Sequence, residues 1–191
     1  MARKRLRPRG CITLLLFVVV MFICFFGIDM VKEWLFPQDH REEITEICEP
    51  YGMDPWLVMA VIREESGFEE DACSSAGACG LMQIMPTTAE WIVSKGTFDF
   101  TAEDVLTDPH CNIQAGVWYL NWLLHHYDGN TQLTCAVAAY NAGHATVDGW
   151  LKEGVWDGST ETLAQIPYAE TQKYVEYVLK SREMYHDLYG G

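Results

Sequence analysis

The feature that most constrains the fold is a stretch of eighteen uncharged, mostly apolar residues, from Cys11 to Ile28. Extended to Val31, it approaches the roughly 20 residues that a helix needs to cross a hydrocarbon core about 30 Å thick. Five basic residues lie among the ten that precede it, and such residues favour the cytoplasmic side of a membrane. The pattern predicts a cytoplasmic basic segment (1–10), a transmembrane signal anchor (11–31), a juxtamembrane stretch (32–36) and an exported domain (37–191).

A cleaved signal peptide is the alternative interpretation of this segment. Cleavage requires small residues before the cut site, and the segment has no Ala-x-Ala pattern. The residues before Cys24 are Phe22 and Ile23, which differ from the small residues that precede a lipid-modified cysteine. We therefore predict an uncleaved anchor, and either interpretation exports the domain that follows.

The exported domain is strongly acidic. From Pro37 onward the sequence has seven basic residues against 25 acidic ones, a net charge of about -18. Nucleic-acid binding depends on clustered lysine and arginine side chains. We therefore expect no nucleic-acid partner.

Helix start signals recur through this domain, and no segment alternates apolar and polar residues as a half-buried strand would. The pairs Asp54-Pro55 and Asp108-Pro109 each place a capping side chain before a first-turn proline. Thr101 and Asp104 have the spacing of a capping box. The helix that starts at Pro109 should stop at Asp128-Gly129.

Two further helices are expected nearer the C-terminus. One should run from about Thr131 to a left-handed Gly143, and the last should cover roughly residues 170–188. Two irregular stretches, 67–80 and 154–168, interrupt the helical pattern. Because sites are commonly built on loops that a rigid scaffold positions, we expect an all-α domain with a cleft beside these loops.

A carboxylate pair ends the helix that begins at Asp54. Glu64 and Glu65 lie where the apolar part of this helix meets the irregular stretch. Burial without a cationic partner raises the pKa of a carboxyl group and keeps it protonated near neutral pH. Helical spacing alone does not choose between the two residues, and either or both could be solvated surface acids.

Three later segments, Ser74–Pro86, Ala139–Gly143 and Ile166–Val175, narrow this choice. Taken in order with the Glu65-Ser66 pair, they resemble the catalytic domain of the soluble lytic transglycosylases, family 23 of the glycoside hydrolases. The resemblance covers about residues 37–188. It implies an all-α, lysozyme-like fold with a substrate cleft, in a bacterial protein. The apolar stretch predicts one N-terminal transmembrane helix before this domain, in the cytoplasmic membrane.

The resemblance also implies a role for single residues. Glu65 corresponds to the catalytic acid, and Glu64 to a variable neighbour. Ser74 and Tyr140 correspond to hydroxyls that hold or tune the acid. Five further residues correspond to substrate contacts in the cleft or to their supports: Gln83, Met85, Asn141, Tyr168 and Glu170. For Met85 and Glu170, a core methionine and a first-turn helix carboxylate are equally good interpretations.

One carboxyl group suffices for the reaction that the resemblance implies. Most glycosidases place two acids around the scissile bond, whereas a lytic transglycosylase uses the C6 hydroxyl of its N-acetylmuramic acid substrate as the nucleophile. Glu65 would protonate the glycosidic oxygen and then accept the hydroxyl proton, leaving a 1,6-anhydromuramoyl end on the peptidoglycan strand. The rival interpretations are a muramidase that uses water and an inactive wall-binding scaffold that kept the fold.

The cysteines and histidines suggest no further chemistry. Five cysteines lie in the exported domain: Cys48, Cys73, Cys79, Cys111 and Cys135. We expect one disulfide between two of the three at positions 73, 79 and 111, and a buried, unpaired cysteine at 135. The pair His125-His126 lacks the ligand spacing of a zinc site. No glycine-rich phosphate loop is present either. From these two observations we expect neither a metal nor a cofactor.

Overall fold

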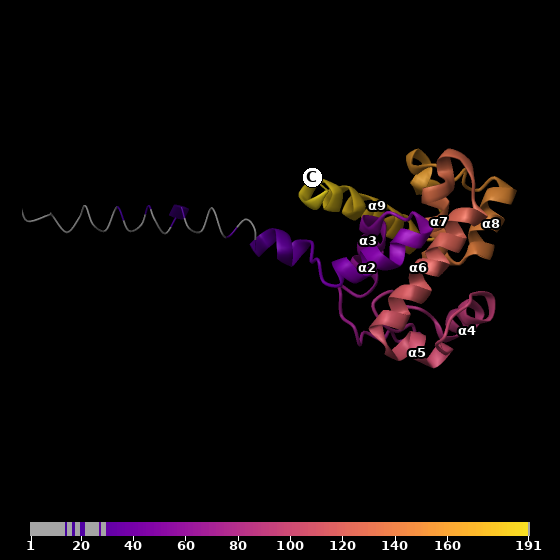
Figure 1. Ribbon diagram of the computed structural model, residues 1–191. Helices are drawn as coiled ribbons and strands as arrows, with labels where there is room; N and C mark the ends of the chain where they lie inside the picture. The colour runs from indigo at the N-terminus through magenta and orange to yellow at the C-terminus, as the bar shows by residue number, and fades with distance from the viewer. Residues whose placement is uncertain (1–13, 15–16, 18–19, 22–26, 28–29, 191) are drawn as a thin grey trace, which may run out of the picture. The chain divides into compact units, whose positions relative to one another are not determined.

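The computed structural model describes residues 14, 17, 20–21, 27 and 30–190. The chain separates into two compact units, Met1–Pro37 and Gln38–Gly191 (Figure 1). The predicted anchor, 11–31, falls largely outside the described residues. Among those that are described, no helix is both long enough and apolar enough to cross a membrane.

The second unit is built from helices, as the sequence predicts. Its only β pairing among the described residues consists of two isolated bridges, Cys73 with Cys79 and Cys79 with Ile84. The elements in chain order are α2 (Arg41–Cys48), η1 (Glu49–Tyr51), α3 (Pro55–Glu65), α4 (Pro86–Lys95), α5 (Ala102–Thr107), α6 (Pro109–His126), η2 (Gly129–Thr131), α7 (Gln132–Ala142), α8 (His144–Glu153), η3 (Thr160–Gln165) and α9 (Ala169–Tyr189).

Helix α3 forms the centre of the unit. Six consecutive residues, 57–62, are buried, which is the pattern of a helix covered on all sides. It packs against α9 on one side and α2 on another. It begins at Pro55, as predicted. The Asp54 side chain caps this end by accepting a hydrogen bond from the Trp56 backbone N–H at 3.0 Å. The apolar stretch thus holds the helix in the core and leaves its polar C-terminal end at the core boundary.

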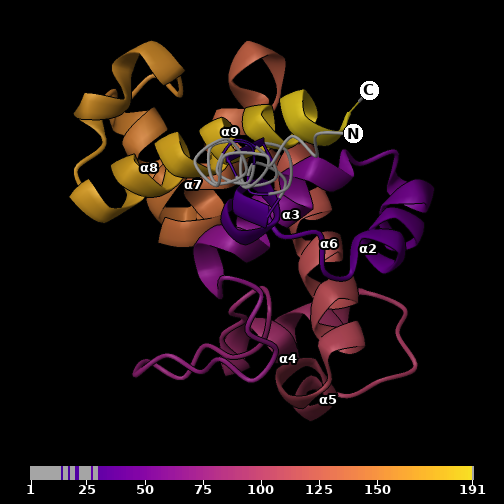
Figure 2. The ribbon, with the colours of Figure 1, turned by 90° about the vertical axis from the view of Figure 1, so that its left-hand side faces the viewer.

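The long helix α6 connects two groups of helices. In Figures 1 and 2, α4 and α5 lie together at one end of the unit, and α7, α8 and α9 lie at the other. Helix α6 contacts α4 and α5 in the first group and α7 in the second, and α7 in turn contacts α8 and α9. The predicted first turns of α5 and α6 are confirmed: Thr101 and Asp104 form a capping box, and Asp108 caps α6.

Two predicted helix ends differ in detail. Helix α6 ends at His126, two residues before the expected Asp128-Gly129 stop. Gly143 ends α7 with a φ of 84° and a ψ of 138°, so its φ is positive but it is not in the left-handed helical region. The reason is that α8 begins at the next residue, and Gly143 serves as the N-cap of α8 as well. Only glycine adopts this backbone conformation without strain.

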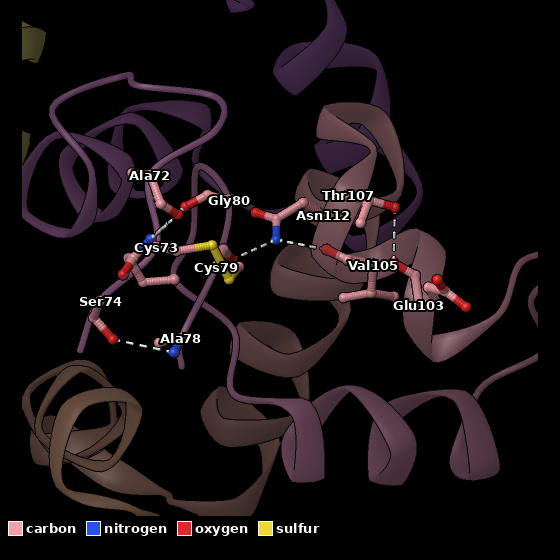
Figure 3. The surroundings of a disulfide bond; sticks show 11 residues. Ala72, Cys73, Ser74, Ala78, Cys79, Gly80, Glu103, Val105, Thr107 and Asn112 are labelled. Carbon is pink, nitrogen blue, oxygen red and sulfur yellow. Dashed lines mark hydrogen bonds between the residues drawn. A yellow bond between two sulfur atoms is a disulfide. The ribbon is translucent and has the colours of Figure 1, made fainter. Parts of the chain in front are cut away.

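A buried asparagine fixes the loop between α3 and α4. The Asn112 side chain on α6 accepts a hydrogen bond from the Met82 backbone N–H at 2.7 Å. Its amide nitrogen donates to the carbonyl oxygens of Cys79, at 3.0 Å, and Val105, at 2.8 Å (Figure 3). The loop also lies so close to α6 that a Cβ on Gly116 would be 2.2 Å from the Met82 sulfur. This loop is therefore tied to both α5 and α6.

The predicted disulfide forms between Cys73 and Cys79 within the same loop (Figure 3). Cys111, the third candidate, has a free thiol. Cys48 and Cys135 are also free and are buried, as predicted for Cys135.

Candidate active site

Glu65 is the last residue of α3, and its neighbour Ser66 ends the helix. The Ser66 hydroxyl donates to the Ile62 carbonyl oxygen and accepts from the Phe68 backbone N–H, both at 3.2 Å. Gly67 and Phe68 then take φ values of 61° and 70°. A positive φ is costly for phenylalanine and is often found at functional sites. The sharp turn leaves Glu65 at the edge of the core rather than in the following loop.

The Glu65 carboxyl group is desolvated, and among the described residues it has one hydrogen-bond donor. The Tyr174 hydroxyl on α9 donates to Glu65 Oε1 at 2.6 Å. Within the described part of the chain, no lysine, arginine or histidine lies within ion-pair distance of this carboxyl group. Burial raises the pKa of Glu65 to about 7; the Tyr174 hydrogen bond lowers it, and the charges of Glu170 and Glu64 raise it. The group is therefore protonated in a large fraction of molecules at neutral pH.

Glu64, the other carboxylate of the pair, has a different environment. It forms an ion pair with Arg63 and accepts a hydrogen bond from Ser181 on α9 at 2.9 Å. Arg63 also donates to the same serine hydroxyl, at 2.9 Å. This network ties α3 to α9 and engages the Glu64 carboxyl group in structural contacts. The geometry thus favours Glu65 over Glu64 as an acid catalyst, a choice that helical spacing left open.

The hydroxyls of Ser74 and Tyr140, which were predicted to hold or tune the acid, form their hydrogen bonds with other groups. Tyr140 donates to the Met82 carbonyl oxygen at 3.0 Å. Burial, followed by the nearby charge of Glu65, holds the pKa of Tyr140 well above its ordinary value, so this phenol stays neutral. Ser74 is exposed, and its hydroxyl accepts from the Ala78 backbone N–H at 3.0 Å inside the disulfide loop (Figure 3).

The hydrogen bond to Glu65 comes instead from Tyr174, for which the motifs predicted no role in the site. On α9, Tyr174 lies on the same buried face as Thr171 and Val178, at helical spacing. Such spacing identifies a core-facing residue but not its partner on α3.

Four of the predicted site residues line one groove of about 210 Å³: Gln83, Met85, Tyr140 and Asn141. The side chains of Ile84, Thr88 and Tyr119 and residues 142–143 complete it. Met85 is 37% exposed, so it is not the core methionine of the alternative interpretation. Gln83 and Asn141 have structural bonds as well: the Gln83 amide donates to the Ala72 and Gly80 carbonyl oxygens, and Asn141 accepts from Thr171 at 2.7 Å.

Tyr168 and Glu170 lie at the start of α9, and neither lines this groove. Tyr168 is 54% exposed, and its ring meets Trp150 edge to face, with 5.2 Å between centroids. Glu170 is an exposed first-turn residue whose negative charge acts on Glu65. Glu170 therefore has the position of the first-turn helix carboxylate, and its predicted role as a substrate contact or support in the cleft stays a prediction.

Comparison with known proteins identifies the family. The model of the transglycosylase SLT domain matches residues 42–162, which include Glu65 and the groove. The chain belongs to this SLT domain family. A soluble lytic murein transglycosylase from Salmonella typhimurium is 33% identical over 81% of this chain and 24% of its own length. A membrane-bound lytic murein transglycosylase C from Edwardsiella ictaluri is 35% identical over 63% of this chain and 36% of its own length.

The SLT fold is also found among solved structures. An inactive variant of the lytic transglycosylase Slt from Pseudomonas aeruginosa, with a glutamate replaced by glutamine, superposes with a TM-score of 0.67. It is 33% identical, and the match covers 80% of this chain and 24% of that one. The predicted all-α, lysozyme-like class is thus confirmed for the SLT domain. The present chain spans about a quarter of the length of the soluble relatives.

Proposed function

We propose that the chain is a lytic transglycosylase that cleaves the β-1,4 bond between N-acetylmuramic acid and N-acetylglucosamine in peptidoglycan, with Glu65 as acid and then base. The observation that carries the proposal is the Glu65 carboxyl group itself. Burial raises its pKa to about 7, and the Tyr174 hydroxyl donates to one of its oxygens. Its charge also acts on Tyr140, which lines the groove that could accept a glycan. Membership of the SLT family supports the same reaction class.

The proposed reaction needs no catalytic group of the chain beyond this carboxyl, and the N-acetyl group of the muramic acid assists it. Tyr174 occupies Oε1, which leaves Oε2 to donate its proton to the glycosidic oxygen as the bond to C1 breaks. The C6 hydroxyl of the same muramic acid then attacks C1, and its proton returns to Glu65. The carboxyl group ends in its starting state, and the strand gains a 1,6-anhydromuramoyl end without consuming water.

A product-mass experiment tests this proposal. Purified chain and its Glu65→Gln variant would be incubated with isolated peptidoglycan strands, and the released fragments weighed by mass spectrometry. The native chain should release fragments whose ends are one water lighter than reducing ends. Glu65→Gln should release none, because the amide has no acidic proton to donate. Glu64→Gln is the matched control, since Glu64 is engaged with Arg63 and Ser181, and it should keep the activity.

The rival functions give different results in the same experiment. A hydrolytic muramidase would release mainly reducing ends. An inactive wall-binding scaffold would bind strands and release no fragments in any form. Unchanged cleavage by Glu65→Gln would contradict the assignment of the acid.

The N-terminal unit suggests where this activity takes place. We infer from the uncharged stretch and its basic flank that residues 11–31 anchor the chain in the bacterial cytoplasmic membrane and that residues 37–191 face outward, where peptidoglycan lies. In intact spheroplasts, an externally added protease should then digest the domain, and the chain should remain in the membrane fraction after a carbonate wash. Protection from the protease would contradict this orientation.

A further inference from the structure

A group of aromatic rings lies beside the groove and has no role in the proposed reaction. It consists of Trp91 on α4, Trp122 on α6 and His144 at the start of α8, and we refer to these three residues as the aromatic platform. Trp122 meets Trp91 edge to face, with centroids 4.9 Å apart, and meets His144 in the same way at 5.1 Å. Trp91 and His144 are close to parallel, at 27°. Three helices thus hold these rings in fixed orientations.

The platform is accessible from outside. None of its three side chains is fully buried. Trp91 and His144 line a hollow of about 330 Å³, together with Thr87, Thr88, Tyr119 and residue 143. Within the described part of the chain, the hydroxyls of Thr87 and Thr88 make no hydrogen bond. The hollow therefore combines flat apolar surface with free hydroxyl groups.

This combination suits a sugar ring. A pyranose presents C–H bonds on its flat faces and hydroxyls around its rim, so it can lie on an aromatic face while its rim bonds to hydroxyl groups. The preorganised rings lose little conformational freedom on binding, because each is braced by a neighbour. The strongly negative charge of the domain disfavours carboxylates at this surface, whether from a stem peptide or from muramic acid, and leaves the neutral N-acetylglucosamine ring as the better occupant.

The hollow continues the groove described above. Thr88, Tyr119 and Gly143 line both of them. A linear polymer that lies against Gln83 and Asn141 would therefore reach Trp91 at the far end. We propose that the aromatic platform binds an additional sugar ring of the glycan strand, beyond those held in the groove, and so makes the affinity depend on strand length. This proposal rests on the function proposed above.

The test measures how affinity depends on length. Peptide-free glycan strands of two and of eight sugars would be titrated by calorimetry into the full chain carrying Glu65→Gln, so that no strand is cleaved. Trp91→Ala in this background should weaken binding of the eight-sugar strand by about 3- to 10-fold and lower the ratio of the two affinities. Trp91→Tyr, which keeps a ring, should restore much of this ratio.

Two further variants guard against misfolding and indirect effects. His144→Ala removes a ring from the edge of the platform and should lower the same ratio. Trp56→Ala removes a half-buried tryptophan from a separate cluster, where it stacks on Tyr185, and should leave the ratio unchanged. An unchanged ratio in both platform variants would overturn the proposal, as would an equal loss for both strand lengths.

The remaining outcomes separate this proposal from the proposed function. If the platform variants matter only for strands that carry stem peptides, the platform binds peptide and the proposal is wrong. If the native chain releases no fragments while Trp91→Ala still lowers the affinity ratio, the proposed reaction is contradicted and the proposed sugar site is supported. If the native chain cleaves strands and the platform variants leave the affinity ratio unchanged, only the proposal of the sugar site is contradicted.

Discussion

Replacing Glu65 by glutamine should stabilise the folded chain at high pH while abolishing its activity. A buried carboxyl group whose pKa is raised in the folded state binds its proton more tightly there than in the unfolded chain. As pH rises from the unfolded value of 4.5 through about 7, the unfolded state loses this proton first and is favoured. Glutamine has a similar shape, can still accept the Tyr174 hydrogen bond, and does not ionise.

The size of the effect follows from the two pKa values. They differ by about 2.5 units, and each unit corresponds to about 1.4 kcal/mol, so the charge on Glu65 should cost about 3 kcal/mol of folding free energy at pH 8. At pH 4.5 most of this penalty is absent, because the group is protonated in the folded state and half protonated in the unfolded one. The difference in unfolding free energy between Glu65→Gln and the native chain should therefore grow by about 3 kcal/mol from pH 4.5 to 8.

Urea unfolding of both proteins at the two pH values measures this difference. Comparing variant with native chain at each pH cancels the other titrating groups, which the two proteins share. Glu64→Gln is the control and should instead destabilise the chain at pH 8, because it weakens the pair with Arg63. A Glu65→Gln difference that is the same at both pH values would refute the argument that burial raises the pKa of Glu65.

Three further predictions follow from the site and its supports. The rate of strand cleavage by the native chain should fall as pH rises through about 7. Tyr174→Phe should move this fall to higher pH by as much as about one unit, because it removes a hydrogen-bond donor to the ionised Glu65 carboxylate. The pH–rate profiles of the two proteins measure this shift. Asn112→Ala should lower the unfolding free energy by about 3 to 5 kcal/mol, since two buried hydrogen bonds and one part-buried bond are lost, and a loss under 1 kcal/mol in urea unfolding would contradict this. Replacing Cys73 and Cys79 by serine should cost about 2 kcal/mol, the chain entropy of so short a loop, and the native chain under reducing conditions should lose the same amount.

The fold was predictable where local chemistry decides it. Asp54 and Asp108 cap their helices through bonds to residues two or three positions ahead, so the signal lies within one turn of sequence. The end of α7 was less predictable, because Gly143 joins two helices directly and its backbone satisfies both. A tight junction of this kind leaves no loop residues to mark it.

The sequence predicted four residues that line the groove, Gln83, Met85, Tyr140 and Asn141, but it did not predict the contacts around Glu65. The order of the motifs indicated the family, and the resemblance to that family predicted Glu65 and the groove residues. The bond from Tyr174 to Glu65 joins positions 109 apart, and the bonds from Asn112 to the loop span about 30. Such pairings depend on how α9 and α6 pack, and neither residue has a local signal for its partner.

The pKa of Glu65 argues for a single catalytic group. Burial and two neighbouring carboxylates raise it, and its place at the C-terminal end of α3, near the negative end of the helix dipole, acts in the same direction. The Tyr174 hydrogen bond opposes them. A carboxyl group with a pKa of 4.5 would be protonated in only about 0.3% of molecules at pH 7 and would be a poor acid. A much higher pKa would leave few carboxylates to serve as the base. Sites that divide these tasks push two pKa values apart, whereas a value near 7 suits one residue that must both give a proton and take it back.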